Sequence, residues 1–212
     1  MAIDGLPDIA VRLAEYGFAV LKPGTAAMAA IIANRLGAVL DMTEVRVGNG
    51  LTYLSSAGSI PPHTDHPDVR LILWFCHQQD GSGAGANILV DTRSVIHALH
   101  AQLAAELAGV ELHCPGVQTL VPTGTHPLYD SKRKQIFYAP WLCMQPRPAS
   151  VRAFEAELGK SRHQRRILLH AGESLLIDNR RMLHSRDALP RDSHRWLTRY
   201  WIGKKELTRP QQ

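Results

Sequence analysis

The segment Pro61-Pro62-His63-Thr64-Asp65 places an imidazole and a carboxylate two residues apart. In an extended chain, residues two apart point to the same side, so His63 and Asp65 can present ligand atoms to one point. A histidine from elsewhere in the chain would complete a 2-His-1-carboxylate set, which leaves three positions open on one face of Fe(II). By itself the H-x-D spacing is common, and the flanking prolines fit a surface turn equally well.

A second segment, DNRRMLHSR at Asp178–Arg186, follows the apolar run Leu175–Ile177 and contains His184. Arg195 lies eleven residues beyond this histidine. A 2-oxoglutarate that chelates iron through its keto and C1 carboxylate oxygens needs a fixed cation for its C5 carboxylate, and arginine binds carboxylates through two parallel hydrogen bonds. If the turn Ala188–Ser193 joins neighbouring antiparallel strands, His184 and Arg195 lie on one interior face.

Taken together, PPHTD, GESLLIDNRRMLHSR and RWLTRYW resemble the superfamily of taurine dioxygenase, clavaminate synthase and gamma-butyrobetaine hydroxylase. EYGFAVL near the N-terminus and GANILVDT before a helical stretch agree with the layout of this superfamily. The resemblance covers most of the chain. It implies an Fe(II)/2-oxoglutarate oxygenase on a double-stranded β-helix, or jelly roll, a mainly β fold with flanking helices.

The resemblance also implies a role for each residue that matches a functional position of the superfamily. His63, Asp65 and His184 correspond to the iron ligands and catalytic residues, and Arg195 to the arginine that binds the C5 carboxylate of 2-oxoglutarate. Family members often carry a threonine after a Gly-Gly pair as a second contact to this co-substrate. This chain has Gly85-Ala86-Asn87 instead, and the Asn87 amide can donate a hydrogen bond in its place.

Substrate contacts are expected from Arg199, Tyr53 and Ser55. Arg199 shares a strand face with Arg195 because it lies four residues later, although a surface arginine is an equally good interpretation. Tyr138 and Trp141 can wall a pocket, but aromatic residues in strands more often belong to the core. A cationic pocket at Arg199 would favour a substrate that carries a carboxylate, such as an amino acid.

The implied reaction consumes dioxygen and 2-oxoglutarate, releases succinate and CO2, and oxidises an unactivated C–H bond, most often by hydroxylation. The retained carboxylate of Asp65 argues against halogenation, whereas desaturation or cyclisation stays open. One alternative keeps the fold as a non-catalytic binding or regulatory jelly roll with a vestigial metal site. Another is a zinc hydrolase, which is disfavoured because no glutamate adjoins a ligand as general base.

Bulk properties fit one domain over residues 1–212, with a helical N-terminal flank at about 1–40 and a helical insertion at about 94–109. The chain is 45% hydrophobic and has a net charge of +5, but its basic residues are interleaved with acidic ones, so we expect a small-molecule partner and no nucleic acid. Three scattered cysteines predict no disulfide framework. The lack of a leader or membrane-length apolar stretch predicts a cytoplasmic protein without membrane contact. The oligomeric state stays open.

The elements that must position these residues follow from periodicity and capping signals. Thr25 is expected to cap the helix that Gly37 ends, and Ser94 to cap the helix at Val95–Leu107. The region from Val45 to Pro62 is expected to form strand edges and loops. The other expected helices are Pro7–Tyr16 and Ala149–Leu158, and the expected strands are Phe18–Leu21, Leu71–Cys76, Asn87–Val90, Val117–Val121, Gln135–Tyr138, Ser174–Ile177 and Trp196–Ile202.

Overall fold

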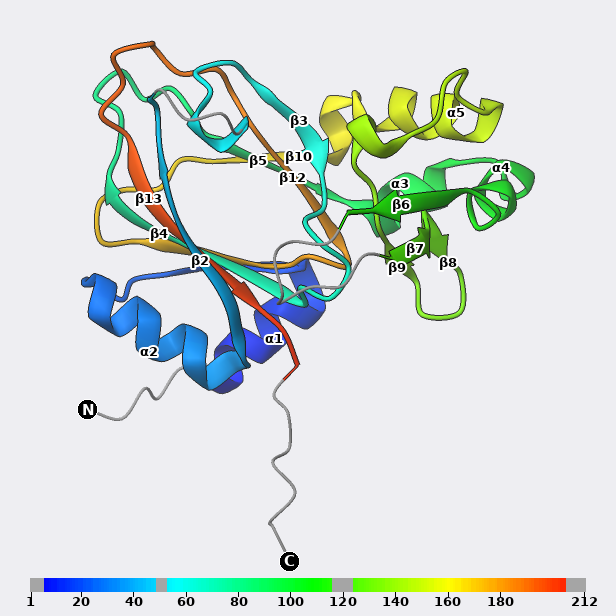
Figure 1. Cartoon of the computed structure of the whole chain (residues 1–212). Coiled ribbons are helices and arrows are strands. Elements are labelled where there is room, and N and C mark those ends of the chain that lie inside the picture. Colours follow the sequence, from blue (N-terminus) through cyan, green and yellow to red (C-terminus); the bar gives the residue numbers. More distant parts are fainter. Residues whose placement is uncertain (1–5, 49–52, 116–123, 205–212) are drawn as a thin grey trace, which may run out of the picture.

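The computed structural model describes residues 6–48, 53–115 and 124–204, and this part of the chain contains two antiparallel sheets that face each other (Figure 1). A mainly β fold with flanking helices is thereby confirmed. The larger sheet has the strand order β1 (Phe18–Leu21), β11 (Ser174–Asp178), β4 (Leu71–Gln78), β13 (Trp196–Ile202) and β2 (Val39–Arg46). The smaller sheet has the order β10 (Gln164–Ile167), β5 (Asn87–Asp91), β12 (Met182–Arg186) and β3 (Ile60–His63).

Apolar side chains fill the space between the two sheets and also cover the outer face of the larger one. β4 is buried over six consecutive residues, as expected for a central strand with both faces covered. Its alternate residues Ile72 and Trp74 point into the space between the sheets, while Leu71 and Leu73 pack under α1 (Leu6–Tyr16) and α2 (Ala26–Leu36). Figure 1 shows both helices lying across this outer face. The helices therefore stiffen the sheet that carries β13.

The boundaries of α2 follow the predicted signals. Thr25 accepts a hydrogen bond from the backbone N–H of Met28, as an N-cap does, and Gly37 ends the helix with its N–H donated to Ala33. Gly37 is needed here for space and not for an unusual backbone conformation. A Cβ at this position would lie 2.3 Å from the carbonyl oxygen of Gly203, just beyond β13.

Residues 92–115 and 124–163 form a second lobe beside the sheets (Figure 1). Its hydrophobic cluster includes Phe154 and Leu112 and reaches Val90 and Leu183 of the smaller sheet. The single helix predicted at Val95–Leu107 is wrong. The chain there forms α3 (Thr92–Ala98) and α4 (Ala101–Leu107), and Asp91, not Ser94, caps the first of them. The lobe also contains β6 (Glu111–Cys114), β7 (Gly124–Pro127), β8 (Tyr129–Asp130), β9 (Gln135–Ile136), η2 (Pro140–Leu142), α5 (Ala149–Leu158) and η3 (Ser161–His163).

Among the other predicted elements, the helix Ala149–Leu158 and the strands Phe18–Leu21 and Trp196–Ile202 are confirmed with their predicted boundaries. Of the predicted strand Gln135–Tyr138, only the two residues of β9 form a strand. The prediction at Val117–Val121 lies outside the described residues. The sequence patterns missed β2, β6, β7, β8, β10 and β12, which are short, or polar along much of their length.

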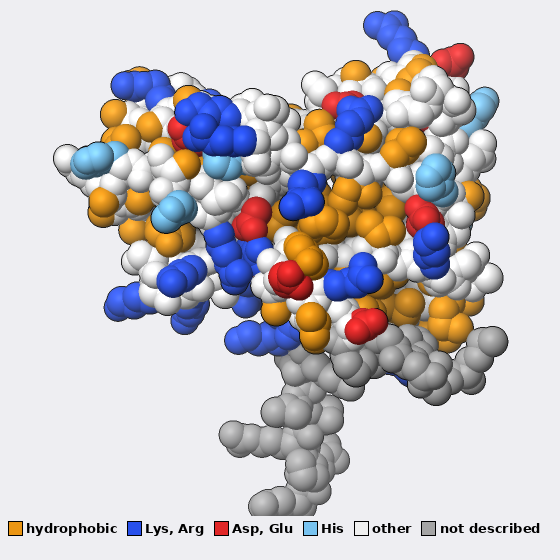
Figure 2. Space-filling model, turned by 180° about the vertical axis from the view of Figure 1, so that it is seen from behind, with side chains coloured by type: hydrophobic (Ala, Val, Ile, Leu, Met, Phe, Trp, Pro, Cys, Tyr) orange, Lys and Arg blue, Asp and Glu red, His pale blue; other side chains and the backbone are white. Residues whose placement is uncertain are grey.

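On the side seen in Figure 2, Lys and Arg side chains lie over both lobes with acidic side chains between them. All three cysteines are free thiols, and Cys76 is fully buried. Within the described ranges, no helix combines the length and the apolar character that crossing a membrane would require.

Gly37→Ala is expected to lower the free energy of unfolding by about 1–3 kcal/mol, because the added methyl group overpacks the contact with Gly203. Chemical denaturation measures the change. Gly81→Ala is the matched control, since a Cβ at Gly81 meets no atom within 4 Å. Equal stability of the two variants would show that the helix end can shift without cost.

Candidate metal centre

Three side chains that are far apart in the sequence meet at the end of the smaller sheet. His63 ends β3 and is the register partner of His184 on β12, so both imidazoles project from neighbouring positions. Asp65 follows His63 by two residues. The Nε2 atoms of His63 and His184 lie 3.8 and 3.7 Å from Oδ1 of Asp65, and one ligand atom from each residue falls within 4.8 Å of the others.

The three groups are buried, with exposed fractions of 2% for His63, 5% for Asp65 and 8% for His184. The surface-turn interpretation of H-x-D is therefore wrong. Their separations exceed a hydrogen bond, but they suit atoms that each lie about 2.0–2.2 Å from a shared ion. Two imidazoles and one carboxylate are also the donor set of the facial triad that binds Fe(II).

The two oxygens of Asp65 have different surroundings. Oδ1 faces both histidines, while Oδ2 accepts hydrogen bonds from Nη1 of Arg199 at 3.1 Å and from Nε1 of Trp201 at 2.6 Å. Arg199 and Trp201 both come from β13, in the opposite sheet. The carboxylate is thus oriented from the larger sheet toward the histidine on the smaller one.

His63 is oriented by its own chain. Its Nδ1 lies 2.8 Å from the carbonyl oxygen of Pro61, and only a protonated ring nitrogen can donate there. Nε2, the atom that faces Asp65, then carries the lone pair. This pattern, with one ring nitrogen donating to a carbonyl and the lone pair of the other directed at the ligand cluster, is typical of metal-binding histidines.

The protonation states suit ligands. Burial lowers the pKa of His63 despite the opposing effect of Asp65. Burial, together with the neighbouring His63, lowers the pKa of His184 to about 3. Burial by itself would raise the pKa of Asp65, but Arg199, the two histidines and the Trp201 hydrogen bond outweigh it, so that pKa is lowered. Near neutral pH the site therefore contains two neutral imidazoles and one carboxylate.

A small hollow of about 40 Å³ adjoins the triad and brings Arg195 and Asn87 to the same place. Nε and Nη2 of Arg195 and Nδ2 of Asn87 are buried and make no hydrogen bond to the described residues. Gly85, with φ at +71°, makes room here, since a Cβ would lie 2.4 Å from Leu189 and 3.2 Å from Cδ of Arg195. Three donors that lack an acceptor in this hollow point to an anionic ligand.

His184 and Arg195 reach this hollow by a different route from the one predicted. β12 and β13 are not neighbours in one sheet, because the chain crosses from the smaller to the larger sheet between them. The two side chains therefore face each other across the interior. His184 and Arg195 do lie at one interior site, as predicted, but the strand pairing that was predicted to bring them there is wrong.

Comparisons with known proteins agree with this geometry. Residues 115–201 match the family described as taurine catabolism dioxygenase TauD, TfdA family. This match covers the C-terminal part of the chain and includes His184, Arg195 and Arg199. None of the curated proteins matches it by sequence.

Solved structures that share the fold of this chain are distant in sequence. Asparagine oxygenase in complex with Fe(II), 3-hydroxyasparagine and succinate is 17% identical with a TM-score of 0.74, and the match covers 94% of this chain and 79% of that one. AAD-2 in complex with Mn(II) and N-oxalylglycine is 11% identical with a TM-score of 0.74, covering 97% and 89%. The non-heme iron oxygenase OrfP in complex with Fe and alpha-ketoglutaric acid is 17% identical with a TM-score of 0.69, covering 95% and 80%.

The predicted substrate-binding residues are only partly brought to the triad. Arg199 is 5% exposed and lies against Asp65, so its interpretation as a surface arginine is wrong. Ser55 is half-buried in η1 (Tyr53–Ser55), and the side chain of Tyr53 lies outside the described part of the chain. Tyr138 belongs to the core of the second lobe, where its hydroxyl donates to Glu155. Trp141 is 51% exposed, and its ring centroid lies 5.0 Å from that of His63.

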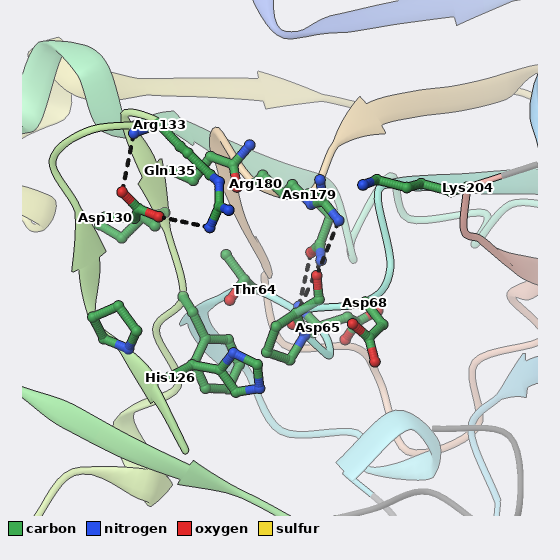
Figure 3. Close-up of a pocket in the computed structure, with 14 residues that line it drawn as sticks. Thr64, Asp65, Asp68, His126, Asp130, Arg133, Gln135, Asn179, Arg180 and Lys204 are labelled. Atoms are coloured by element: carbon green, nitrogen blue, oxygen red, sulfur yellow. Dashed lines mark hydrogen bonds and ion pairs between the residues drawn. The ribbon is translucent and has the colours of Figure 1, made fainter. Parts of the chain in front are cut away.

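Asn179 holds the turn that carries Asp65 and was not predicted as a site residue. Its Oδ1 accepts from the backbone N–H of Asp65 at 2.8 Å, and its Nδ2 donates to the carbonyls of His66 and Val69 at 3.2 and 2.9 Å. Figure 3 shows this side chain pointing at the Asp65 turn, and both residues line a hollow of about 290 Å³. Its place directly after β11 was the available signal.

Asn179→Ala is expected to weaken Fe(II) binding by about 10–100-fold, because the backbone around Asp65 loses the bonds that fix it. Anaerobic calorimetric titration with Fe(II) measures the affinity. Asn34→Ala serves as control, since Asn34 is exposed on α2 and bonds only its own helix at the Ala30 carbonyl. An unchanged affinity in the Asn179 variant would mean that the turn holds its shape without this side chain.

Proposed function

We propose that this protein is an Fe(II)- and 2-oxoglutarate-dependent dioxygenase, built on a double-stranded β-helix, that hydroxylates an unactivated C–H bond of a small carboxylate-bearing or amino-acid-like molecule. Succinate and CO2 are the co-products. The observation that carries the proposal is the buried convergence of His63, Asp65 and His184 beside Arg195, whose Nε and Nη2 have no partner among the described residues. Structures with the same fold hold Fe(II) with succinate or Fe with alpha-ketoglutaric acid, which supports the same ligands here.

His63, Asp65 and His184 would hold the iron. Bound Fe(II) and 2-oxoglutarate supply the oxidising chemistry, in which dioxygen is consumed and one of its oxygen atoms reaches the substrate. The protein's own side chains orient the groups that would bind the iron. Arg199 and Trp201 engage one oxygen of Asp65, so the other oxygen is the one available beside the histidines. This leaves the remaining positions of a facial site to ligands from outside the chain.

Arg195 and Asn87 would hold the distal carboxylate of 2-oxoglutarate. Arg195 is 3% exposed, and burial, with a contribution from Arg186, lowers its pKa to about 10, so it stays a cation near neutral pH. A buried cation without an anion is costly, and a carboxylate in the hollow would remove that cost. Asn87 adds an uncharged donor from the strand opposite.

The substrate would enter beside Trp141 and Arg199. Trp141 offers a half-exposed aromatic ring next to His63. Arg199 contributes a cation whose Nε makes no hydrogen bond to the described residues. Both features favour a compact molecule with a carboxylate, and the asparagine oxygenase that shares the fold bears a hydroxylated amino acid.

His184→Ala and Asp65→Ala are each expected to abolish succinate formation, because a facial site that loses one of its three protein ligands no longer holds the metal in this geometry. The assay is turnover of 2-oxoglutarate with Fe(II) under air, against a panel of amino acids and small carboxylates. His170→Ala, an exposed histidine, is the control. Fe(II) and 2-oxoglutarate binding without turnover on any panel member would favour the non-catalytic binding protein instead.

Arg195→Ala is expected to raise the KM for 2-oxoglutarate by about thirtyfold or more, since a charge-assisted pair of hydrogen bonds is lost from a buried site. The kcat at saturating 2-oxoglutarate is expected to change less. Steady-state kinetics over a wide range of co-substrate concentration separates the two effects. A KM equal to that of the wild type would place the distal carboxylate elsewhere.

A further inference from the structure

A second arginine lies in the hollow that holds Arg195. Arg186 follows His184 by two residues on β12, so both side chains point to the same face, and it is the register partner of Asn87. The hollow is lined by Asn87, Arg186 and Arg195 together. Arg186 and Arg195 are 5% and 3% exposed, so two cations are buried side by side.

No acidic side chain lines this hollow among the described residues. Nε of Arg186 is buried and makes no hydrogen bond to the described residues. The same is true of Nε and Nη2 of Arg195 and of Nδ2 of Asn87. Burying two like charges without a counter-ion is strongly unfavourable unless an anion enters. A volume of about 40 Å³, on the order of three water positions, suits one small anionic group.

The other end of the Arg186 guanidinium is engaged differently. Its Nη2 donates to the carbonyls of Ser56 and Gly58 at 2.5 and 2.6 Å. The backbone N–H of Leu189 donates to the carbonyl of Ala57 between them. These carbonyls belong to the loop that runs from η1 into β3, and β3 ends at His63. One guanidinium therefore joins the hollow to the loop that leads into the metal centre.

We propose that Arg186 is a second carboxylate-binding residue of the co-substrate site, sharing the distal carboxylate of 2-oxoglutarate with Arg195 while its Nη2 holds the loop at residues 56–58. This inference rests on the proposed function. Co-substrate binding and loop position then depend on each other. A carboxylate that fixes the guanidinium of Arg186 also fixes its Nη2, which donates to the carbonyls of Ser56 and Gly58. The loop directly follows η1, which contains Tyr53 and Ser55, two of the predicted substrate contacts.

The experiment compares two ligands of the Fe(II)-loaded protein by anaerobic calorimetry. 2-Oxoglutarate has the distal carboxylate, whereas 2-oxobutyrate shares only the end that would chelate the metal. Arg186→Gln is expected to weaken 2-oxoglutarate binding about tenfold or more and to leave 2-oxobutyrate binding within about twofold. Arg165→Gln, an exposed arginine on β10 of the same sheet, is the control and is expected to change neither affinity.

Hydrogen exchange at residues 54–60 gives a second readout. In the wild type, 2-oxoglutarate is expected to slow exchange of these amides, and in Arg186→Gln this added protection is expected to be lost. Arg186→Lys keeps the charge without the fork and is used if the glutamine variant does not fold. The lysine variant is expected to bind 2-oxoglutarate about tenfold more weakly than the wild type does.

The outcomes separate the inference from the proposal beneath it. Wild-type affinity for 2-oxoglutarate in the variants, or equal weakening of both ligands, overturns the role of Arg186 and leaves the proposed function standing. Unchanged protection of residues 54–60 in a variant overturns the coupling to the loop. If the wild type itself binds no 2-oxoglutarate with Fe(II) present, the proposed function fails and the inference fails with it.

Discussion

The carboxylate of Asp65 is the one group on which both halves of the structure converge. Its Oδ2 is held by Arg199 and Trp201 of the larger sheet, and its Oδ1 faces His63 and His184 of the smaller one. An ionised carboxylate that is 5% exposed requires compensation from several directions, and here opposite sheets provide it. The relative position of the two sheets therefore sets the geometry of the metal centre.

The apolar packing between and behind the sheets therefore also holds the polar atoms of the metal centre in place. Trp74 packs its ring 5.0 Å from that of His184, and its strand β4 pairs with β13, which carries Arg199 and Trp201. α1 and α2 cover the back of the same sheet. A loss of packing between the sheets would move β13 relative to β12 and so separate the charges that stabilise one another. Stability and site geometry are linked through the same contacts.

The sequence was sufficient where local signals were strong. Thr25 and Gly37 marked the ends of α2. The apolar run of β13 located a strand, and the H-x-D spacing located two of the three triad residues. The prediction failed where long-range packing decided. The helix break at Leu99–His100 has no glycine or proline, and β12 pairs with β3 and β5 because the chain crosses to the other sheet before β13. Trp201 was missed because only tertiary contacts reveal its role, and Asn179 because its place directly after β11 was its only local signal.

The second lobe contributes to the metal centre in a different way from the two sheets. It places Trp141 beside His63, and Trp141 is half exposed. Its hydrophobic cluster also reaches Val90 and Leu183 of the smaller sheet, and the backbone of Tyr138 exchanges hydrogen bonds with Thr64, which lies between His63 and Asp65. Exposed positions of this lobe can therefore vary more freely than the contacts by which it supports the triad. A lineage could change side chains such as Trp141 while the three triad residues and the contacts that hold them pass unchanged from ancestor to descendant.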